Sequence, residues 1–185
     1  MRSILFLLSG SLLAFAQSAP PVGLEPAWDI GVILDELGAN ASRVLPPIEK
    51  LEPLKWAAKG ASETYTAQWQ SSREQARAIA DTAHALAKNP EHLGPALDLF
   101  FRIDALERML GSLEQGARKY QDVASAQAIE AVFAEGSANR ERLRRYIVNL
   151  ATERERQLDV MDKEAQRCRA TLFAPVPSKT TGRKK

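Results

Sequence analysis

The sequence is poor in the residues that carry most protein chemistry. Its 185 residues include one cysteine and two histidines, and only 6% are aromatic. A single cysteine excludes a disulfide framework within the chain and haem attachment through Cys-x-x-Cys-His. No Gly-x-Ser-x-Gly, Gly-x-x-x-x-Gly-Lys or Gly-x-Gly-x-x-Gly segment occurs either. The usual signatures of hydrolases, phosphate loops and dinucleotide sites are therefore missing, and we predict no enzyme, no catalytic residue and no cofactor.

The histidines do not fit a metal site. His84 follows Asp81 by three residues, which places both on one helix face. Di-iron bundles use Glu-x-x-His at this spacing, but they need two copies and further glutamates. His92 has no carboxylate three residues before it, so the chain offers one imperfect copy and we predict no metal ligands. Glu153 and Glu155 lie two apart, cannot face one another on a helix, and are predicted to be solvated.

The first residues, MRSILFLLSGSLLAFA, have the order of an export signal. Arg2 gives a positive start, residues 4–15 are mostly apolar, and Ala14-Phe15-Ala16 is the small-x-small pattern that signal peptidases accept. We predict a signal peptide over residues 1–16, an irregular leader over 17–25, and export to the periplasm or the medium. The alternative is an uncleaved anchor, but the apolar run is shorter than the roughly 20 residues of a membrane-spanning helix. No transmembrane segment is expected after signal removal.

Apolar residues elsewhere recur at helical spacing, and no alternating stretch predicts a sheet. The predicted fold class is all-α: an antiparallel bundle of three to four long helices over residues 26–172. A disordered basic tail follows over 173–185. A break between helices at Gly136 decides between a compact bundle and an elongated one.

The first two helices are delimited by proline. The first starts at Pro26 and is expected to end near Leu45, because Pro46-Pro47 removes two backbone donors. The second starts at Pro53 and ends at Asn89-Pro90. Its apolar positions recur every three or four residues, a seven-residue repeat typical of helices packed side by side: Tyr65, Trp69, Ser72, Ala76, Ile79, Ala83 and Leu86. Most are small after Trp69, which predicts a close neighbouring helix.

The later helices follow the same spacing. A third helix starts near Pro90 or after Gly94-Pro95, with a bend or break expected near Gly116. A last helix follows Gly136 and carries two ion pairs with a spacing of four, Glu141 with Arg145 and Asp159 with Lys163. The predicted buried positions are Leu97, Phe100, Ile103, Leu106, Leu110, Leu113, Val123, Ala126, Ile129, Val132, Leu143, Ile147, Leu150, Leu158, Met161, Ala165 and Cys168.

Cys168 raises the question of why an exported chain has one thiol. It continues the spacing of Met161 and Ala165, so we predict that it packs as a small buried residue. The alternative is an intermolecular disulfide, which an odd cysteine in an oxidising compartment can form. A catalytic thiol is disfavoured: Arg167 and Arg169 favour a thiolate, but both histidines are distant in sequence.

Charge argues against nucleic acid as a partner. Of 25 Lys and Arg residues, Arg2 lies in the signal and four in the tail, which leaves 20 against 23 acidic residues. The densest basic stretch, NRERLRRY, puts Arg140 and Arg144 on one side of a helix and Arg142 and Arg145 on another. It lacks interleaved aromatics, so we predict a solvated face.

The tryptophans and one asparagine complete the candidates. Trp69 lies on the repeat and is predicted to be core, whereas Trp28 and Trp56 are expected to cap the end of the bundle or line a groove. Asn40-Ala41-Ser42 matches the N-glycosylation triplet inside a predicted helix.

The combined features favour an exported, non-catalytic bundle that acts through protein–protein or envelope interaction. We expect a protein partner or self-association, because long charged helices with seven-residue repeats are typical of helix-mediated assemblies. The alternative is binding of a small ligand or metal between the helices.

Signal removal can be checked by intact mass. Protein recovered from the exported fraction is expected to begin at Gln17, which intact-mass spectrometry under reducing conditions measures directly. A mass that retains residues 1–16 would contradict the cleavage and favour an anchor.

Overall fold

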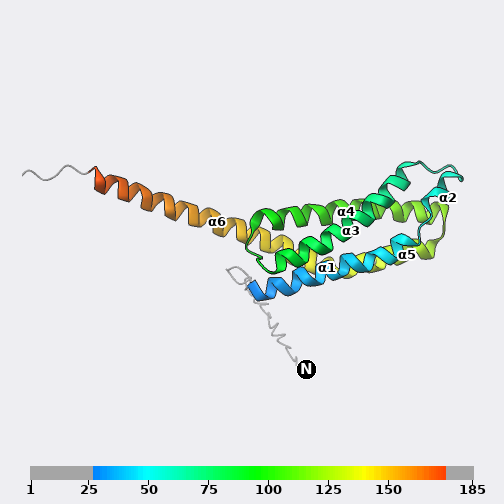
Figure 1. The fold of residues 1–185 in the computed structure, drawn as a ribbon, viewed down its shortest axis with the longest axis horizontal. Helices are drawn as coiled ribbons and strands as arrows, with labels where there is room; N and C mark the ends of the chain where they lie inside the picture. Colours follow the sequence, from blue (N-terminus) through cyan, green and yellow to red (C-terminus); the bar gives the residue numbers. More distant parts are fainter. Residues whose placement is uncertain (1–26, 174–185) are drawn as a thin grey trace, which may run out of the picture.

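The computed structural model describes residues 27–173, and this part of the chain is all helical, as predicted. The predicted signal peptide (1–16), the leader (17–25) and, apart from Phe173, the predicted tail (173–185) lie outside the described residues. Six helices follow one another and pack together (Figure 1): α1 (Ala27–Glu49), α2 (Pro53–Ala57), α3 (Thr64–Ala87), α4 (Leu93–Tyr120), α5 (Val123–Glu135) and α6 (Ser137–Leu172). No described helix is both long and apolar enough to cross a lipid bilayer.

The long helices lie side by side around one core. Helix α1 packs on α3, α3 packs on α4, and α5 and the start of α6 share the groove between α4 and α1. The core includes Trp56 and an aliphatic set with at most 1% exposure: Ile30, Ile33, Leu34, Ile48, Ile79, Leu99, Leu106, Leu113, Ile129, Leu143 and Leu150. We call α1–α5 with residues 137–150 of α6 the body.

Helices α1 and α3 approach closely because small residues face each other. A Cβ at Gly38 would lie 3.2 Å from the Ala80 carbonyl oxygen and 3.3 Å from the Ala83 Cβ. Ala76 and Ala83 are fully buried on the facing side of α3. The close neighbour predicted for the α3 repeat is therefore α1. Ala76 and Ala83, two small residues of that repeat, are buried at this contact.

Three helix boundaries differ from the predictions. The second helix, predicted to run unbroken from Pro53, is divided: α2 ends at Ala57 and α3 begins at Thr64, with Gly60 at a φ of 86° between them. The expected end of the first helix near Leu45 is wrong: α1 includes Pro46 and Pro47 and continues to Glu49. Each proline removes an N–H bond to the carbonyl four residues earlier, but the helix ends within a turn of them, and fully buried Val44 and Ile48 hold this segment against the core. The break expected near Gly116 is also absent, because α4 runs unbroken to Tyr120.

The break predicted at Gly136 is confirmed, and two side chains bond the end of α5 beside it. The Asn40 Nδ2 group donates to the Val132 carbonyl at 2.8 Å, and Arg140 Nη1 donates to the Phe133 carbonyl at 2.8 Å. Such carbonyls at a helix C-terminus lack partners within the helix. A Cβ at Gly136 would lie 2.5 Å from Asn40 Oδ1, so any larger residue here would displace the Asn40 amide.

The opposite end of the body is joined by Gln121. Its Oε1 accepts from the Glu52 backbone N–H at 3.0 Å and from Trp56 Nε1 at 3.1 Å. Its Nε2 donates to the Lys50 carbonyl at 3.2 Å. This side chain in the α4–α5 turn therefore connects that turn to the α1–α2 connection. Trp56, predicted to cap the end of the bundle or line a groove, is only 1% exposed and lies in the core here.

Glycine packing yields a paired prediction. At Gly116, a Cβ would lie 2.8 Å from Tyr65 and 2.9 Å from Trp56, whereas at Gly111 it would meet nothing within 4 Å. We expect Gly116→Ala to lower the free energy of unfolding by about 1–3 kcal/mol through overpacking. The control, Gly111→Ala in the same helix, should raise it by up to about 1 kcal/mol through helix propensity. Urea unfolding followed by circular dichroism measures both, and equal changes would contradict the packing at Gly116.

Candidate functional site

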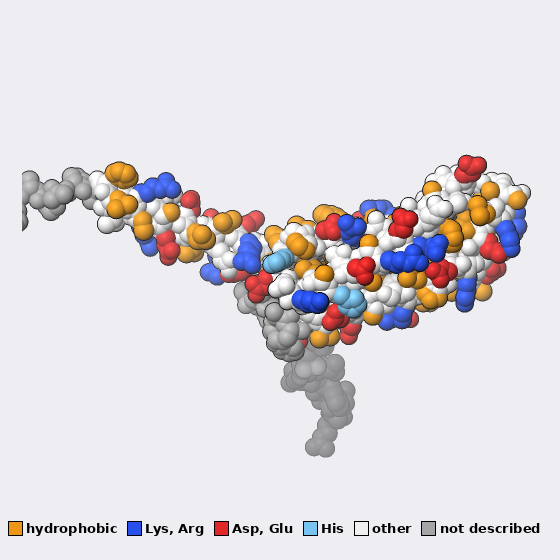
Figure 2. All heavy atoms as spheres, viewed as in Figure 1, with side chains coloured by type: hydrophobic (Ala, Val, Ile, Leu, Met, Phe, Trp, Pro, Cys, Tyr) orange, Lys and Arg blue, Asp and Glu red, His pale blue; other side chains and the backbone are white. Residues whose placement is uncertain are grey.

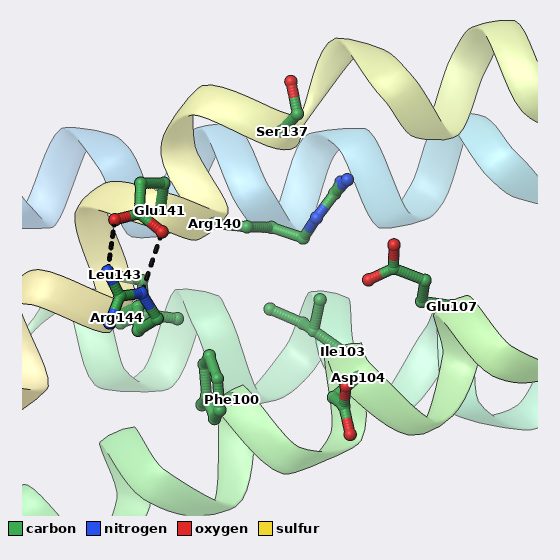
Figure 3. Close-up of a pocket in the computed structure, with 9 residues that line it drawn as sticks. All are labelled: Phe100, Ile103, Asp104, Glu107, Ser137, Arg140, Glu141, Leu143 and Arg144. Atoms are coloured by element: carbon green, nitrogen blue, oxygen red, sulfur yellow. Dashed lines mark hydrogen bonds and ion pairs between the residues drawn. The ribbon is translucent and has the colours of Figure 1, made fainter.

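One candidate is a cavity between α4 and the first turns of α6 (Figure 3). It has a volume of about 220 Å³. Its lining combines two apolar side chains of α4 with charged groups of both helices: Phe100, Ile103, Asp104, Glu107, Ser137, Arg140, Glu141, Leu143 and Arg144. Arg140 and Arg144 were predicted to lie on one side of the helix, and this is confirmed because both line the cavity.

Both arginines of the cavity already have partners. Arg140 bonds the Phe133 carbonyl and lies over the Phe133 ring, with its guanidinium carbon 4.0 Å from the ring centroid. Burial lowers the pKa of Arg140, and the nearby Glu107 carboxylate opposes this effect. Arg144 makes two bonds to Glu141, at 2.6 and 2.8 Å (Figure 3). Glu141 thus bonds Arg144, and the charge of Arg145, its predicted partner, lowers the pKa of Glu141 as a smaller effect.

The cavity is poorly suited to an organic ligand. Pockets for such ligands usually have volumes of about 300–1,000 Å³, with a few polar groups left to orient the ligand. This one is smaller at about 220 Å³, and its three carboxylates outnumber its two guanidiniums, so it offers no positive charge in excess to attract an anion. The Arg140 side chain also has a structural use, because it satisfies a carbonyl at the end of α5.

A second candidate begins where α6 leaves the body. Leu150 is the last buried residue of α6. The buried Tyr146 hydroxyl donates to the Pro90 carbonyl at 3.1 Å, and Arg154 Nη2 lies 3.6 Å from the Glu91 carboxylate. These contacts fix α6 against the α3–α4 turn. Beyond them the helix continues to Leu172, and Figure 1 shows it projecting away from the other helices.

Residues 155–172, which we call the arm, carry an exposed apolar stripe. Leu158 and Met161 are each 64% exposed and Leu172 is 80% exposed. Ala165 is partly covered. Figure 2 shows hydrophobic side chains along the arm among charges of both signs. We name Leu158, Met161, Ala165, Cys168 and Leu172 the arm stripe.

The predicted burial of Cys168 is wrong. The structure places the thiol at the surface of the arm as a free cysteine. Its spacing with Met161 and Ala165 is helical as expected, but the described body ends before this part of α6. Periodicity shows that residues share a helix face, and it does not show what covers that face. The predicted burial of Leu158 and Met161 is wrong for the same reason. The predicted burial of Val123, in the first turn of α5, is also wrong, since it is 48% exposed.

One histidine pairs with a carboxylate, and the other lies at the surface. His84 Nδ1 lies 2.7 Å from Asp35 Oδ1 of α1, and the structure records no contact with Asp81. His92 lies at the surface just before α4, without a side-chain cap bond. Across residues 27–173, no three His, Cys, Asp or Glu side chains are grouped closely enough to hold a metal ion. Glu153 bonds Arg156 at 2.7 and 2.9 Å instead of facing Glu155.

The remaining candidates serve packing. Asn40 is 5% exposed and its amide nitrogen bonds Val132, so the folded chain has no room for a glycan on it. Trp69 is half-buried against the core and donates from Nε1 to the Ile48 carbonyl at 2.8 Å. The side chain of Trp28 lies outside the described residues.

Comparisons with known proteins add no assignment: no family model, curated protein or solved structure matches this chain. The arm is the feature that sequence reasoning missed. One signal for it was present, because the predicted last helix was much longer than a body of this size requires.

Tyr146 gives this junction a predicted pH dependence. Burial raises the pKa of its hydroxyl above the usual value of 10, with a further rise from Glu91. A folded-state pKa above the unfolded one means that the proton stabilises the fold. That contribution is complete below about pH 10 and is lost as the pH rises through the folded-state pKa.

Tyr146→Phe tests this. The variant should be about 1 kcal/mol less stable at pH 8, because the bond to Pro90 is lost. It should then lose less stability than the wild type between pH 9 and pH 11.5. Urea unfolding at each pH measures the difference, and parallel losses in the two proteins would contradict the role of Tyr146.

Proposed function

We propose that this is an exported, non-catalytic protein that acts through protein–protein contact, and that the arm is its contact element. The observation that carries the proposal is the exposure of the arm stripe on a helix continuous with the body. We interpret the body as an antiparallel bundle of four rods, the fourth formed by α5 and residues 137–150 of α6. In this interpretation the body holds the start of α6 in place, and so fixes the direction of the arm.

Energetics support a partner on the arm stripe. Burying a side chain such as Leu or Met stabilises by about 1.5–3 kcal/mol relative to leaving it exposed. Leu158, Met161 and Leu172 remain at least 64% exposed, so the uncovered arm forgoes most of that energy. Apolar side chains aligned on one face of a solvent-exposed helix are typical of helix-mediated recognition.

Ligand binding between the helices is the weaker candidate. The cavity of Figure 3 is where a ligand would sit, but it holds only about 220 Å³. Its Arg140 and Arg144 side chains are already bonded to Phe133 and Glu141. A ligand would have to displace these bonds, whereas the arm stripe offers apolar area without breaking any bond that the structure records.

The native size of the protein tests the proposal. In an extract of its own exported fraction, the wild type should elute from a sizing column in a complex larger than one chain. Met161→Glu should shift it to the size of a monomer, because the charge enters the arm stripe. Val160→Glu, at a neighbouring residue that is 44% exposed and off the stripe, should leave the complex intact. A wild type that elutes as a monomer over its native concentration range would contradict the proposal.

A further inference from the structure

We propose that the partner of the arm is a second copy of the arm, bound antiparallel so that Met161 of each chain faces Leu172 of the other. This inference rests on the proposed function, since it assigns the occupant of the same surface. The spacing of the stripe, the position of the body and the charges beside the stripe each restrict the pairing.

The arm stripe has the spacing of a coiled coil. Its residues follow steps of three, four, three and four: Leu158, Met161, Ala165, Cys168 and Leu172. These steps place Leu158, Ala165 and Leu172 at a positions of a seven-residue repeat, and Met161 and Cys168 at d positions. Asp162 and Arg169 then occupy the flanking e positions, and Glu164 a flanking g position.

The body excludes a parallel pair. Leu143, Ile147 and Leu150 face the core, and Met161, Ala165 and Cys168 each lie 18 residues further along. Eighteen residues are about five helical turns, so both sets point to the same side of α6. A parallel partner would continue along this side into space that the body fills. An antiparallel partner would place only its arm along this side, because the arm projects away from the body (Figure 1).

Charge selects the register of the antiparallel pair. Two alignments of the antiparallel helices bring four residues of each stripe opposite four of the other, with a positions facing d positions. In one, Met161 faces Ala165 of the second copy, and Asp162 and Glu164 each lie opposite their own counterparts. In the other, Met161 faces Leu172 and each Asp162 lies beside Arg169 of the second copy. The first register also sets Arg169 beside Glu155 of the second copy, so its two attractive pairs are offset by its two repulsive ones. The second register keeps two attractive pairs and has no repulsive one, and within residues 27–173 neither Asp162 nor Arg169 has a recorded salt bridge.

In this register, Cys168 does not face Cys168 of the second copy, so the two thiols are not placed to form a disulfide. Its thiol lies opposite Ala165 of the second copy, so two small residues form each central layer and let the helices approach. The two Cys168 side chains are offset by three residues along the pair. We therefore expect a non-covalent dimer under oxidising conditions. Two repeats are fewer than the three to four that mark a sustained coiled coil, so its formation should depend on concentration.

Sedimentation equilibrium of the purified mature chain tests the pairing. The wild type should move from monomer to dimer as its concentration rises from micromolar to millimolar. Met161→Glu should remain monomeric, whereas Val160→Glu should dimerise like the wild type. Circular dichroism confirms that both variants keep the helical body. A wild type that is monomeric throughout this range would overturn self-association.

Cross-linking tests orientation and register. Wild-type chains, with Cys168, are mixed with the variant Ala165→Cys/Cys168→Ser, and a mild oxidant is added. The antiparallel register places these two thiols in one layer, so the mixture should give a disulfide-linked heterodimer, and each protein alone should give little. A parallel pair would reverse this pattern, because like residues would then face each other. Disulfide-linked homodimers of each protein, without the heterodimer in the mixture, would overturn the orientation.

A charge exchange tests the flanking pairs. Asp162→Arg and Arg169→Asp should each weaken dimerisation about tenfold, since each turns two attractive pairs into repulsive ones. The double variant should recover wild-type affinity. Failure of this rescue would overturn the register.

The two proposals can fail separately. A purified chain that stays monomeric, while the native extract holds a Met161-dependent complex, would overturn self-association and support a different protein partner. Monomers in both settings would overturn both proposals.

Discussion

The groove between α1 and α4 sets the main constraint on this structure, because it is shorter than the chain that fills it. Helix α4 has 28 residues, α1 has 23 and α3 has 24, whereas α6 alone has 36. Helix α5 and residues 137–150 of α6 together are about as long as α4, and they occupy the groove end to end. The rest of α6 has nowhere to pack within the described chain. The exposed arm is therefore a consequence of length rather than of composition.

The break at Gly136 leaves carbonyl groups at the end of α5 that two side chains satisfy. Asn40 bonds the Val132 carbonyl and Arg140 bonds the Phe133 carbonyl. These bonds also explain why the cavity beside Arg140 is a weak ligand site. The arginine that would attract an anion there already holds the end of α5.

Local patterns predicted most of the body. The spacing of Ile79, Ala83 and Leu86 identified a buried face, and Gly136 marked a real break. Pro46 was misleading because proline rules describe the backbone alone, and burial of Val44 and Ile48 outweighs them here. Cys168 was mispredicted for a different reason. Its helical phase is correct, but coverage of a helix face depends on where the neighbouring helices end, and no local pattern records that.

The arm also shows how a short contact element can be ordered before it binds. An isolated helix of this length is marginal in water, because its first turn must fix several residues for one hydrogen bond. The arm avoids that cost since it extends a helix that Tyr146 and Leu150 already anchor in the body. A partner therefore meets a formed helix, and little ordering entropy opposes association. This preorganisation supports our proposal that so short a stripe is sufficient for a weak, reversible contact between two copies of the chain.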